Sequence, residues 1–198
     1  MNLVQEECFL SLSKVILSYS YVSSESLVKL QNMCKIKNIK KGDTLLHFGD
    51  FSKDIYFICK GLLRTYILDE NGNVYNKNIF LENEFSGSKV SLILGTPSDF
   101  SIEALENTTL ISIPYIQYKE LIVKNNDLKD FYIAYLEKNW IIEKEKYEIS
   151  LVLEDATKRY QTYLKKHPNI EKRVNQHHIA AHLGITPTQL SRIRKKLK

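Results

Sequence analysis

Short apolar runs separated by turns occupy the middle of the chain, between Ile36 and Ile113. Six of the seven glycines lie among these runs, so tight turns are concentrated in this region. The segment Asp69–Gly72 (DENG) has the composition of a hairpin tip. Many short strands at this spacing are typical of antiparallel sheets. The pattern predicts an α+β protein whose N-terminal part is a β jelly roll with flanking helices.

Helical spacing appears on both sides of the predicted strands. Ser23 or Ser24 is suited to cap a helix in front of them. A second helix-prone stretch begins near Ile116, after Pro114, and is interrupted at Asn125–Asn126. The first helix has an apolar face, which we expect to pack on the roll and which comprises Leu27, Leu30 and Cys34.

A heptad spacing of apolar residues follows from Leu128 onward. It predicts one long helix over residues 127–154 that pairs with the same helix of a second copy. Lys138 and Glu145 interrupt the second position of the seam. The alternative is a helix that packs wholly against its own roll. The predicted dimer interface comprises Leu128, Phe131, Tyr135, Ile142 and Ile149.

Residues 178–197 (HIAAHLGITPTQLSRIRKKL) contain two short amphipathic runs separated by Gly184. Glycine adopts the left-handed conformation at little cost, which permits the sharp turn of a helix-turn-helix. Thr186 and Gln189 have the spacing of a capping box, and Pro187 fits the first helical position. The alternative is a helical hairpin with an ordinary polar surface. The residues that we expect to face inward are Leu190, Ile193 and Leu197.

The charge is distributed unevenly along the chain. Residues 158–198 hold eleven lysines and arginines against one acid, Glu171, which gives this tail +10. Since the whole chain carries +5, the remaining 157 residues sum to −5. A basic end on an acidic body is expected when that end meets a polyanion, whereas a solvated lysine-rich surface is the alternative interpretation.

The polar face of the last predicted helix favours DNA as the polyanion. Short polar side chains near the start of such a helix suit base edges in the major groove, and later basic side chains suit phosphates. The predicted DNA-binding residues are Thr186, Thr188, Gln189, Ser191, Arg192, Arg194, Lys195 and Lys196.

The overall composition excludes several other classes of protein. No apolar run approaches the roughly 20 residues that span a bilayer, and the N-terminus is acidic where a signal peptide is basic, so we expect a cytoplasmic protein without membrane contact. Cys8, Cys34 and Cys59 form no Cys-x-x-Cys pair, and we expect free thiols.

Two segments resemble bacterial transcription factors of the cyclic-AMP receptor protein and fumarate–nitrate regulator (CRP/FNR) family: KKGDTLLHFGDFSKDIYFICKGLLR (40–64) and IAAHLGITPTQLSRIRKKL (179–197). The resemblance implies a homodimer that binds double-stranded DNA and contacts RNA polymerase. It also implies three parts: a cyclic-nucleotide-binding-like sensor domain over residues 1–126, a dimerisation helix over 127–154 and a helix-turn-helix domain over 155–198. Arg192 and Thr188 fall where the family places base or phosphate contacts. Pro187 replaces a residue that reads bases in some members, so the target sequence does not carry over.

The sequence departs from the family at the cyclic-nucleotide cassette. In members that bind cyclic AMP, a glutamate holds the ribose and an arginine pairs with the phosphate. Here Ser88 stands at the glutamate position and Ser98–Asp99 at the arginine–serine pair. Losing the cation disfavours a buried phosphate, so we predict a degenerate pocket that does not bind cyclic AMP. Two interpretations stay open: the pocket takes an unidentified small-molecule effector, or the roll binds nothing and serves as a rigid dimer scaffold. The candidate pocket residues are Arg64, Gly87, Ser88, Lys89, Ser98 and Asp99, with Arg64 and Lys89 as substitute cations or ordinary strand-end charges.

The resemblance also implies a β-hairpin wing after the recognition helix. The sequence ends at Lys198, so we expect lower affinity for DNA and phosphate contacts from the cluster Arg194–Lys198.

Two functions of other classes remain open at this point. One is a regulator that acts through ligand or protein contacts without touching DNA. The other is a cupin-like metalloenzyme, but only His47 lies in residues 1–157, and His178 with His182 lacks an evident third ligand. Because no nucleophile has a recognisable base and no phosphate-binding loop occurs, we predict no enzyme activity, no metal and no cofactor.

Overall fold

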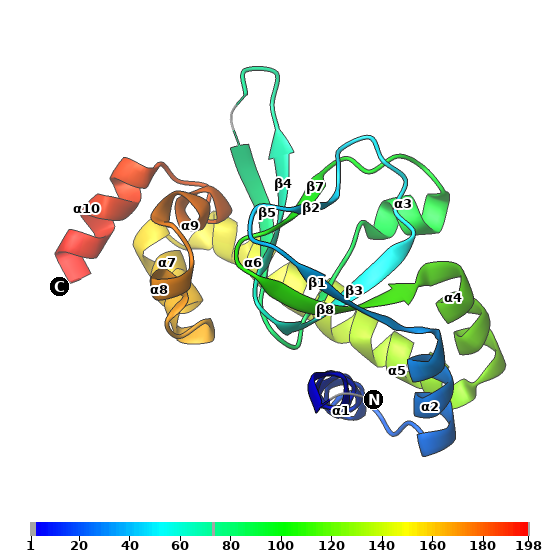
Figure 1. The fold of residues 1–198 in the computed structure, drawn as a ribbon. Helices are drawn as coiled ribbons and strands as arrows, with labels where there is room; N and C mark the ends of the chain where they lie inside the picture. Colours follow the sequence, from blue (N-terminus) through cyan, green and yellow to red (C-terminus); the bar gives the residue numbers. More distant parts are fainter. Residues whose placement is uncertain (1–2, 73, 198) are drawn as a thin grey trace.

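Two four-stranded antiparallel sheets form the centre of the computed structural model, which describes residues 3–72 and 74–197 (Figure 1). In the first sheet the strand order is β1 (Lys35–Ile39), β8 (Thr108–Pro114), β3 (Asp54–Lys60) and β6 (Phe85–Ser86). In the second sheet the order is β2 (Thr44–Leu46), β7 (Ser101–Ala104), β4 (Leu63–Leu68) and β5 (Val74–Phe80). The predicted roll is confirmed, and Asp69–Gly72 lies at the turn between β4 and β5.

The two sheets enclose an apolar interior. Alternate residues of β3, β4 and β7, such as Ile58, Leu63 and Ile102, are fully buried there. The turn from β3 to β4 passes Gly61, where an added Cβ would lie 2.4 Å from the Oγ1 of Thr108. The left-handed φ of +106° at Gly61 adds a second reason why only glycine fits.

Helices cover the outer face of the first sheet (Figure 1). They are α1 (Leu3–Leu17), α2 (Ser24–Met33), α3 (Lys89–Leu94), α4 (Tyr115–Lys124) and α5 (Asn126–Leu136). The hydroxyl of Ser23 accepts from the N–H of Ser26 at 3.2 Å, which confirms the predicted cap of α2. The Asp127 carboxylate accepts from both Ser23 and Ser26, so it joins α2 to the start of α5.

The long helix is continuous but irregular. After α5 it passes through a π-helical segment, η1 (Glu137–Ile142), and continues as α6 (Glu143–Leu153). A π-helix bonds i to i+5, so it rotates later side chains away from the face set by earlier ones. A regular heptad would place residues 128, 135, 142 and 149 on one face. After this rotation, residues 142 and 149 no longer share the face of residues 128 and 135.

This rotation corrects part of the predicted dimer interface. Leu128 and Phe131 are buried in the core between α5 and the first sheet, and Tyr135 packs against the same core. Leu128 and Phe131 are therefore used within the chain and are not available to a partner, whereas Tyr135 is half-buried. By contrast, Ile142 is 48% exposed and Ile149 is 50% exposed.

A compact set of helices forms the C-terminal part: α7 (Ala156–Lys166), α8 (Ile170–Arg173), α9 (Gln176–His182) and α10 (Pro187–Leu197). Their apolar residues, including Tyr160, Ile170 and Leu190, form one cluster with Leu62 and Ile79 of the roll. The C-terminal helices are therefore packed directly on one side of the roll. Lys198, which the charge count includes, lies outside the described residues.

Within the described residues, no helix is both long enough and apolar enough to cross a membrane. Cys8, Cys34 and Cys59 are free, as predicted, and burial raises the pKa of Cys34 to about 12.

Candidate functional site

The turn between α9 and α10 has the predicted local structure. Gly184 adopts a left-handed φ of +68° and ends α9. The N–H of Gln189 donates to the Oγ1 of Thr186 at 3.1 Å, and the N–H of Thr186 donates to the Oε1 of Gln189 at 2.9 Å. This reciprocal pair is the predicted capping box. Gln189 therefore caps the helix through Oε1.

One face of α10 is anchored and the other is exposed. Leu190 is fully buried and Ile193 is partly buried in the C-terminal cluster, as predicted. Leu197, predicted to face inward, is 42% exposed because it lies in the last turn, beyond the reach of that cluster. The exposed polar and basic residues are Thr186, Thr188, Gln189, Ser191, Arg192, Lys195 and Lys196. In Figure 1, α10 lies at one edge of the molecule, at the end opposite to α4.

Arg194 differs from the other predicted DNA-binding residues. Its Nε donates to the Oε1 of Glu171 at 2.8 Å, and the side chain is partly buried. Glu171 also accepts from the hydroxyl of Tyr160 at 2.5 Å. Arg194 is therefore paired through Nε with Glu171, unlike the exposed Lys195 and Lys196, and its contact with a DNA phosphate stays a prediction.

Two arginines fasten the C-terminal helices to the roll. Arg173 of α8 forms ion pairs with Glu82, at 2.6 Å, and with Glu106. The pKa of the Arg173 guanidinium is raised by hydrogen bonds to these two carboxylates. Both carboxylates belong to the roll, so this contact joins distant parts of the sequence.

Arg64 is the second fastening arginine, and it does not line an effector pocket as predicted. Its Nη2 lies 2.6 Å from the Oε2 of Glu103, which sits opposite it in the β4–β7 register. Its Nη1 donates to Asn76 at 3.1 Å and lies 3.0 Å from the Nδ1 of His178 on α9. Burial, and then the charge of Arg64, lower the pKa of His178 to about 4. A neutral His178 accepts the Arg64 hydrogen bond at physiological pH.

The remaining predicted pocket residues do not form one cavity either. Ser88 and Ser98 are buried and hydrogen-bonded to each other, with 2.9 Å between their hydroxyl oxygens. Gly87 lies against the backbone of Asp54 and Ile55, while Asp99 is exposed. The two serines are uncharged and bonded to each other, so they offer a phosphate no cation at this position.

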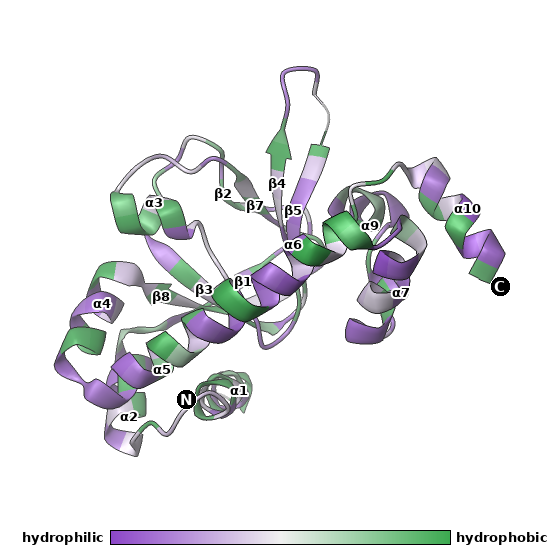
Figure 2. Ribbon diagram, turned by 180° about the vertical axis from the view of Figure 1, so that it is seen from behind, coloured by the Kyte–Doolittle hydropathy of each residue, from purple (hydrophilic) through white to green (hydrophobic). Residues whose placement is uncertain are grey.

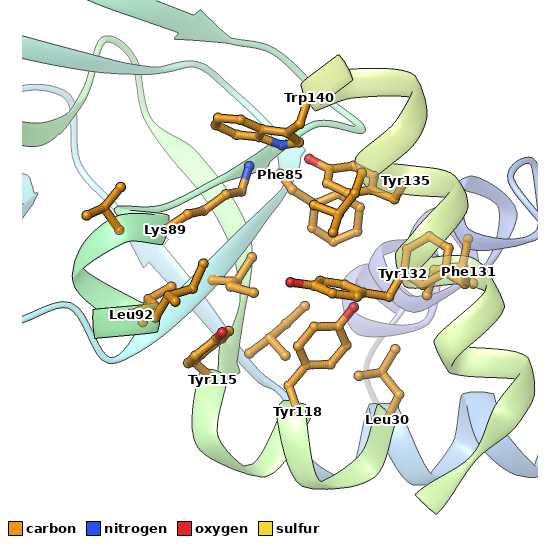
Figure 3. A pocket seen from close by; sticks show the side chains of 16 residues that line it. Leu30, Phe85, Lys89, Leu92, Tyr115, Tyr118, Phe131, Tyr132, Tyr135 and Trp140 are labelled. Atoms are coloured by element: carbon orange, nitrogen blue, oxygen red, sulfur yellow. The ribbon is translucent and has the colours of Figure 1, made fainter. Parts of the chain in front are cut away.

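Lys89, in contrast, lines a cavity of about 260 Å³ on the helix-covered face of the first sheet (Figure 3). The cavity lies between α3, α4, the long helix and strands β3 and β8. Its other lining residues are Ile16, Leu30, Ile55, Phe85, Val90, Leu92, Ile93, Ile113, Tyr115, Tyr118, Phe131, Tyr132, Tyr135, Leu136 and Trp140. Almost all of this surface is aliphatic or aromatic, which is typical of small-molecule sites.

The Lys89 amine is the cationic group of this cavity. Its Nζ lies 3.9 Å from the ring centroid of Trp140 and 5.6 Å from that of Tyr135. Burial among apolar groups, and then repulsion from Lys77, lower the pKa of Lys89 to about 7. Lys89 is among the residues predicted from the sequence, whereas the aromatic side chains that line the cavity are not. The run FYIAYLEKNW (131–140) signals aromatic density, but not which side of the helix faces the roll.

A metal-dependent site finds no support in the arrangement of side chains. Across residues 3–72 and 74–197, no group of three or more histidine, cysteine, aspartate or glutamate side chains is placed to hold a metal ion. His178 is engaged with Arg64, and His182 packs on the ring of Tyr163. The cupin-like alternative therefore lacks a ligand set in this part of the chain.

Comparison with known proteins supports a cyclic-nucleotide-binding fold. Residues 36–125 match the family model of the cyclic nucleotide-binding domain. No curated protein sequence matches the chain. The matched segment contains all eight strands except the first residue of β1, together with α3 and α4.

Several solved structures share the fold over most of the chain. The proposed cyclic nucleotide binding protein of Ruegeria pomeroyi aligns with a TM-score of 0.69 at 16% identity, covering 98% of this chain and 87% of that one. The c-di-GMP responsive global regulator CLP of Xanthomonas campestris aligns with a TM-score of 0.68 at 15% identity, covering 88% and 91%. The Thermus thermophilus catabolite activator protein aligns with a TM-score of 0.55 at 20% identity, covering 89% and 84%. The N-terminal roll is thus a cyclic-nucleotide-binding fold similar to that of CRP/FNR-type regulators.

Proposed function

We propose that the protein is a homodimeric, DNA-binding transcription regulator of the CRP/FNR type, in which α10 reads the major groove. The observation that carries this proposal is the α9–α10 pair: a glycine turn, a complete capping box and an anchored helix with Thr188, Ser191 and Arg192 exposed. Short polar groups early in such a helix, followed by arginine, match the donors and acceptors of base edges. Lys195 and Lys196 follow at a position suited to phosphates.

The dimer is proposed to form through α6 and the end of η1. No residue of α6 is buried, although the helix carries several large apolar side chains. Ile142, Ile149 and Leu153 are spaced by seven and four residues, which places them on one helical face. Leu153 is 78% exposed and Val152 is 83% exposed. Figure 2 shows hydrophobic residues alternating with hydrophilic ones along α6, where it leaves the roll. A second copy would cover this face, as the long helices of a dimer do.

A two-fold dimer sets the form of the DNA site. Two α10 helices that enter successive major grooves on one face of the duplex require an inverted repeat with half-sites about one helical turn apart. Selection of bound fragments from a random DNA pool is expected to return such repeats. Recovery of no duplex at low salt would reject DNA binding and favour the alternative function, a regulator that acts only through protein contacts.

Cyclic AMP is expected to have no effect on this protein. Ser88 and Ser98 bond to each other where a ribose contact and a phosphate cation are needed, and Arg64 is held by Glu103. A phosphate placed there would lose its solvation without gaining a charged partner. We expect no change in melting temperature or DNA affinity at 100 μM cyclic AMP. A saturable calorimetric signal with micromolar affinity would contradict this expectation.

In the cell, the protein is proposed to act in the cytoplasm and to contact RNA polymerase when it is bound beside a promoter. It is also proposed to have no catalytic activity of its own. An effector that occupies the sensor region, rather than a reaction, would set the affinity of α10 for DNA.

A further inference from the structure

We propose that the cavity lined by Lys89 and Trp140 binds a small hydrophobic carboxylic acid, with its carboxylate on the Lys89 amine and its apolar body between α4, α5 and the first sheet. This inference deepens the proposed function, on which its regulatory meaning rests, by giving a chemical class to the effector. The cavity differs from the cassette between the two sheets: Ile55 and Ile113 line it from the outer face of the first sheet.

The shape and lining of the cavity select an apolar body. Aliphatic side chains from α2, α3, β3 and β8 line the cavity, together with the rings of the long helix and those of Phe85, Tyr115 and Tyr118 (Figure 3). Burial raises the pKa of Tyr118 and Tyr135 well above the ordinary range, so these phenols remain neutral. The lining thus offers apolar contacts and neutral hydroxyls, which suit a hydrocarbon or aryl group better than a nucleotide.

The charge of the cavity selects one acidic group. The Lys89 ammonium is directed at Trp140 and Tyr135, as Figure 3 shows. Among the residues that the structure describes, the charged side chain that lowers the pKa of Lys89 is Lys77, which repels it because both are cations. Across the described residues the Nζ of Lys89 lies against ring faces and forms no ion pair with a carboxylate, so this half-buried ammonium gains strongly from an anionic partner. A single carboxylate supplies that partner.

The position of Trp140 connects this cavity to the proposed dimer helix. Trp140 lies in η1, and π-helical segments occur frequently at functional sites. A ligand that fills the cavity contacts the long helix through Tyr132, Tyr135 and Trp140, and this helix continues into α6. Binding of a ligand in the cavity therefore changes the contacts of the long helix, which carries the proposed dimer face on α6.

The test uses the natural fluorescence of the protein. Trp140 is the one tryptophan of the chain and lines the cavity, so selective excitation reports on a cavity residue. The full-length protein is titrated with decanoate and with 3-phenylpropanoate at pH 6.5, and with 1-decanol and decylamine as neutral and cationic comparators. We expect a saturable change with at least one acid, and affinity for decanoate ten- to a hundredfold above that for decanol and decylamine. Equal binding of decanoate and decanol, or no saturable change with either acid, would overturn the proposal.

Variants at two lysines separate charge from packing. Lys89→Met is expected to lower decanoate affinity about ten- to a hundredfold while decanol binding stays the same. Lys119→Met is the matched control, since Lys119 is exposed on α4 and lies over the ring of Tyr132 outside the cavity. Unchanged decanoate binding in Lys89→Met would reject the role of the amine.

A pH titration of the unmodified protein gives an independent measurement if Lys89→Met does not fold. A lysine with a pKa near 7 is mostly charged at pH 6 and mostly neutral at pH 8. The decanoate dissociation constant should therefore rise about tenfold between pH 6 and pH 8, and that of decanol should not change. A decanoate constant that is flat over this range would contradict the inference. All of these readouts are independent of DNA, so loss of the proposed DNA binding would leave them unaffected.

Discussion

Replacing Ile142 and Ile149 with aspartate is expected to convert the dimer to a monomer and to weaken binding to an inverted-repeat DNA site by at least about 100-fold. Both side chains are about half exposed, and neither η1, which holds Ile142, nor α6, which holds Ile149, has a buried residue. Four carboxylates brought together across a two-fold interface would repel one another and lose their solvation. The monomer keeps one reading helix and loses the second half-site. Light scattering and a DNA-binding titration at micromolar protein measure the two effects.

A matched variant tests whether this effect is local to α6. Ile116→Asp changes an isoleucine that is 74% exposed on α4, away from the proposed interface, and is expected to leave a dimer. A wild-type protein that scatters as a monomer, or a double aspartate variant that remains dimeric, would refute the assignment of this face.

Replacing Arg192 with alanine is expected to weaken the selected DNA site by roughly 1–3 kcal/mol, about five- to 160-fold, while affecting random DNA less. Arg192 is exposed on α10, among the residues whose positions suit base edges. Lys195→Ala and Lys196→Ala should instead weaken all sequences alike and reduce the dependence of affinity on salt, because each removes one phosphate contact. Fluorescence anisotropy at several salt concentrations separates the two patterns.

Arg194→Ala provides the contrast within the same helix. Since Arg194 is paired with Glu171, its loss should lower the melting temperature of the C-terminal helices. The ratio of affinities for the selected site and for random DNA should stay close to that of the unmodified protein. Gln189→Ala also removes half of the capping box, so its effect on DNA includes a loss of helix stability. Unchanged binding to the selected site after Arg192→Ala would reject α10 as the reading helix.

Much of the local structure follows from contacts between residues close in sequence. The turn at Gly184 and the capping box of Thr186 and Gln189 involve neighbours three to five positions apart, and their residue types determine the geometry. The same holds for the Ser23 cap and for the tip of the β4–β5 hairpin. For these features the residue types themselves specify the backbone, and the structure agrees with the prediction.

The long helix shows where this local reasoning stops. The heptad spacing from Leu128 to Ile149 is present in the sequence, but the π-helical segment rotates its second half relative to its first. Leu128 then belongs to the core of its own chain, whereas Ile149 is exposed. A spacing rule assumes a regular helix, so it does not detect an irregular turn such as this π-helical segment.

Charged side chains depend even more on the tertiary structure. Arg64, Lys89 and Arg194 are all plausible ligand-binding cations by residue type, but Lys89 is the one that lines the apolar cavity, whereas Arg64 and Arg194 are paired with carboxylates. Arg64 finds Glu103 across 39 residues and His178 across 114, and both contacts require the strand register and the docking of α9. The sequence by itself therefore determined the strands, helix ends and turn that make up the fold's local parts. The tertiary structure decided which cations are paired and which is left facing an apolar cavity, because pairing depends on distances that chain spacing does not fix.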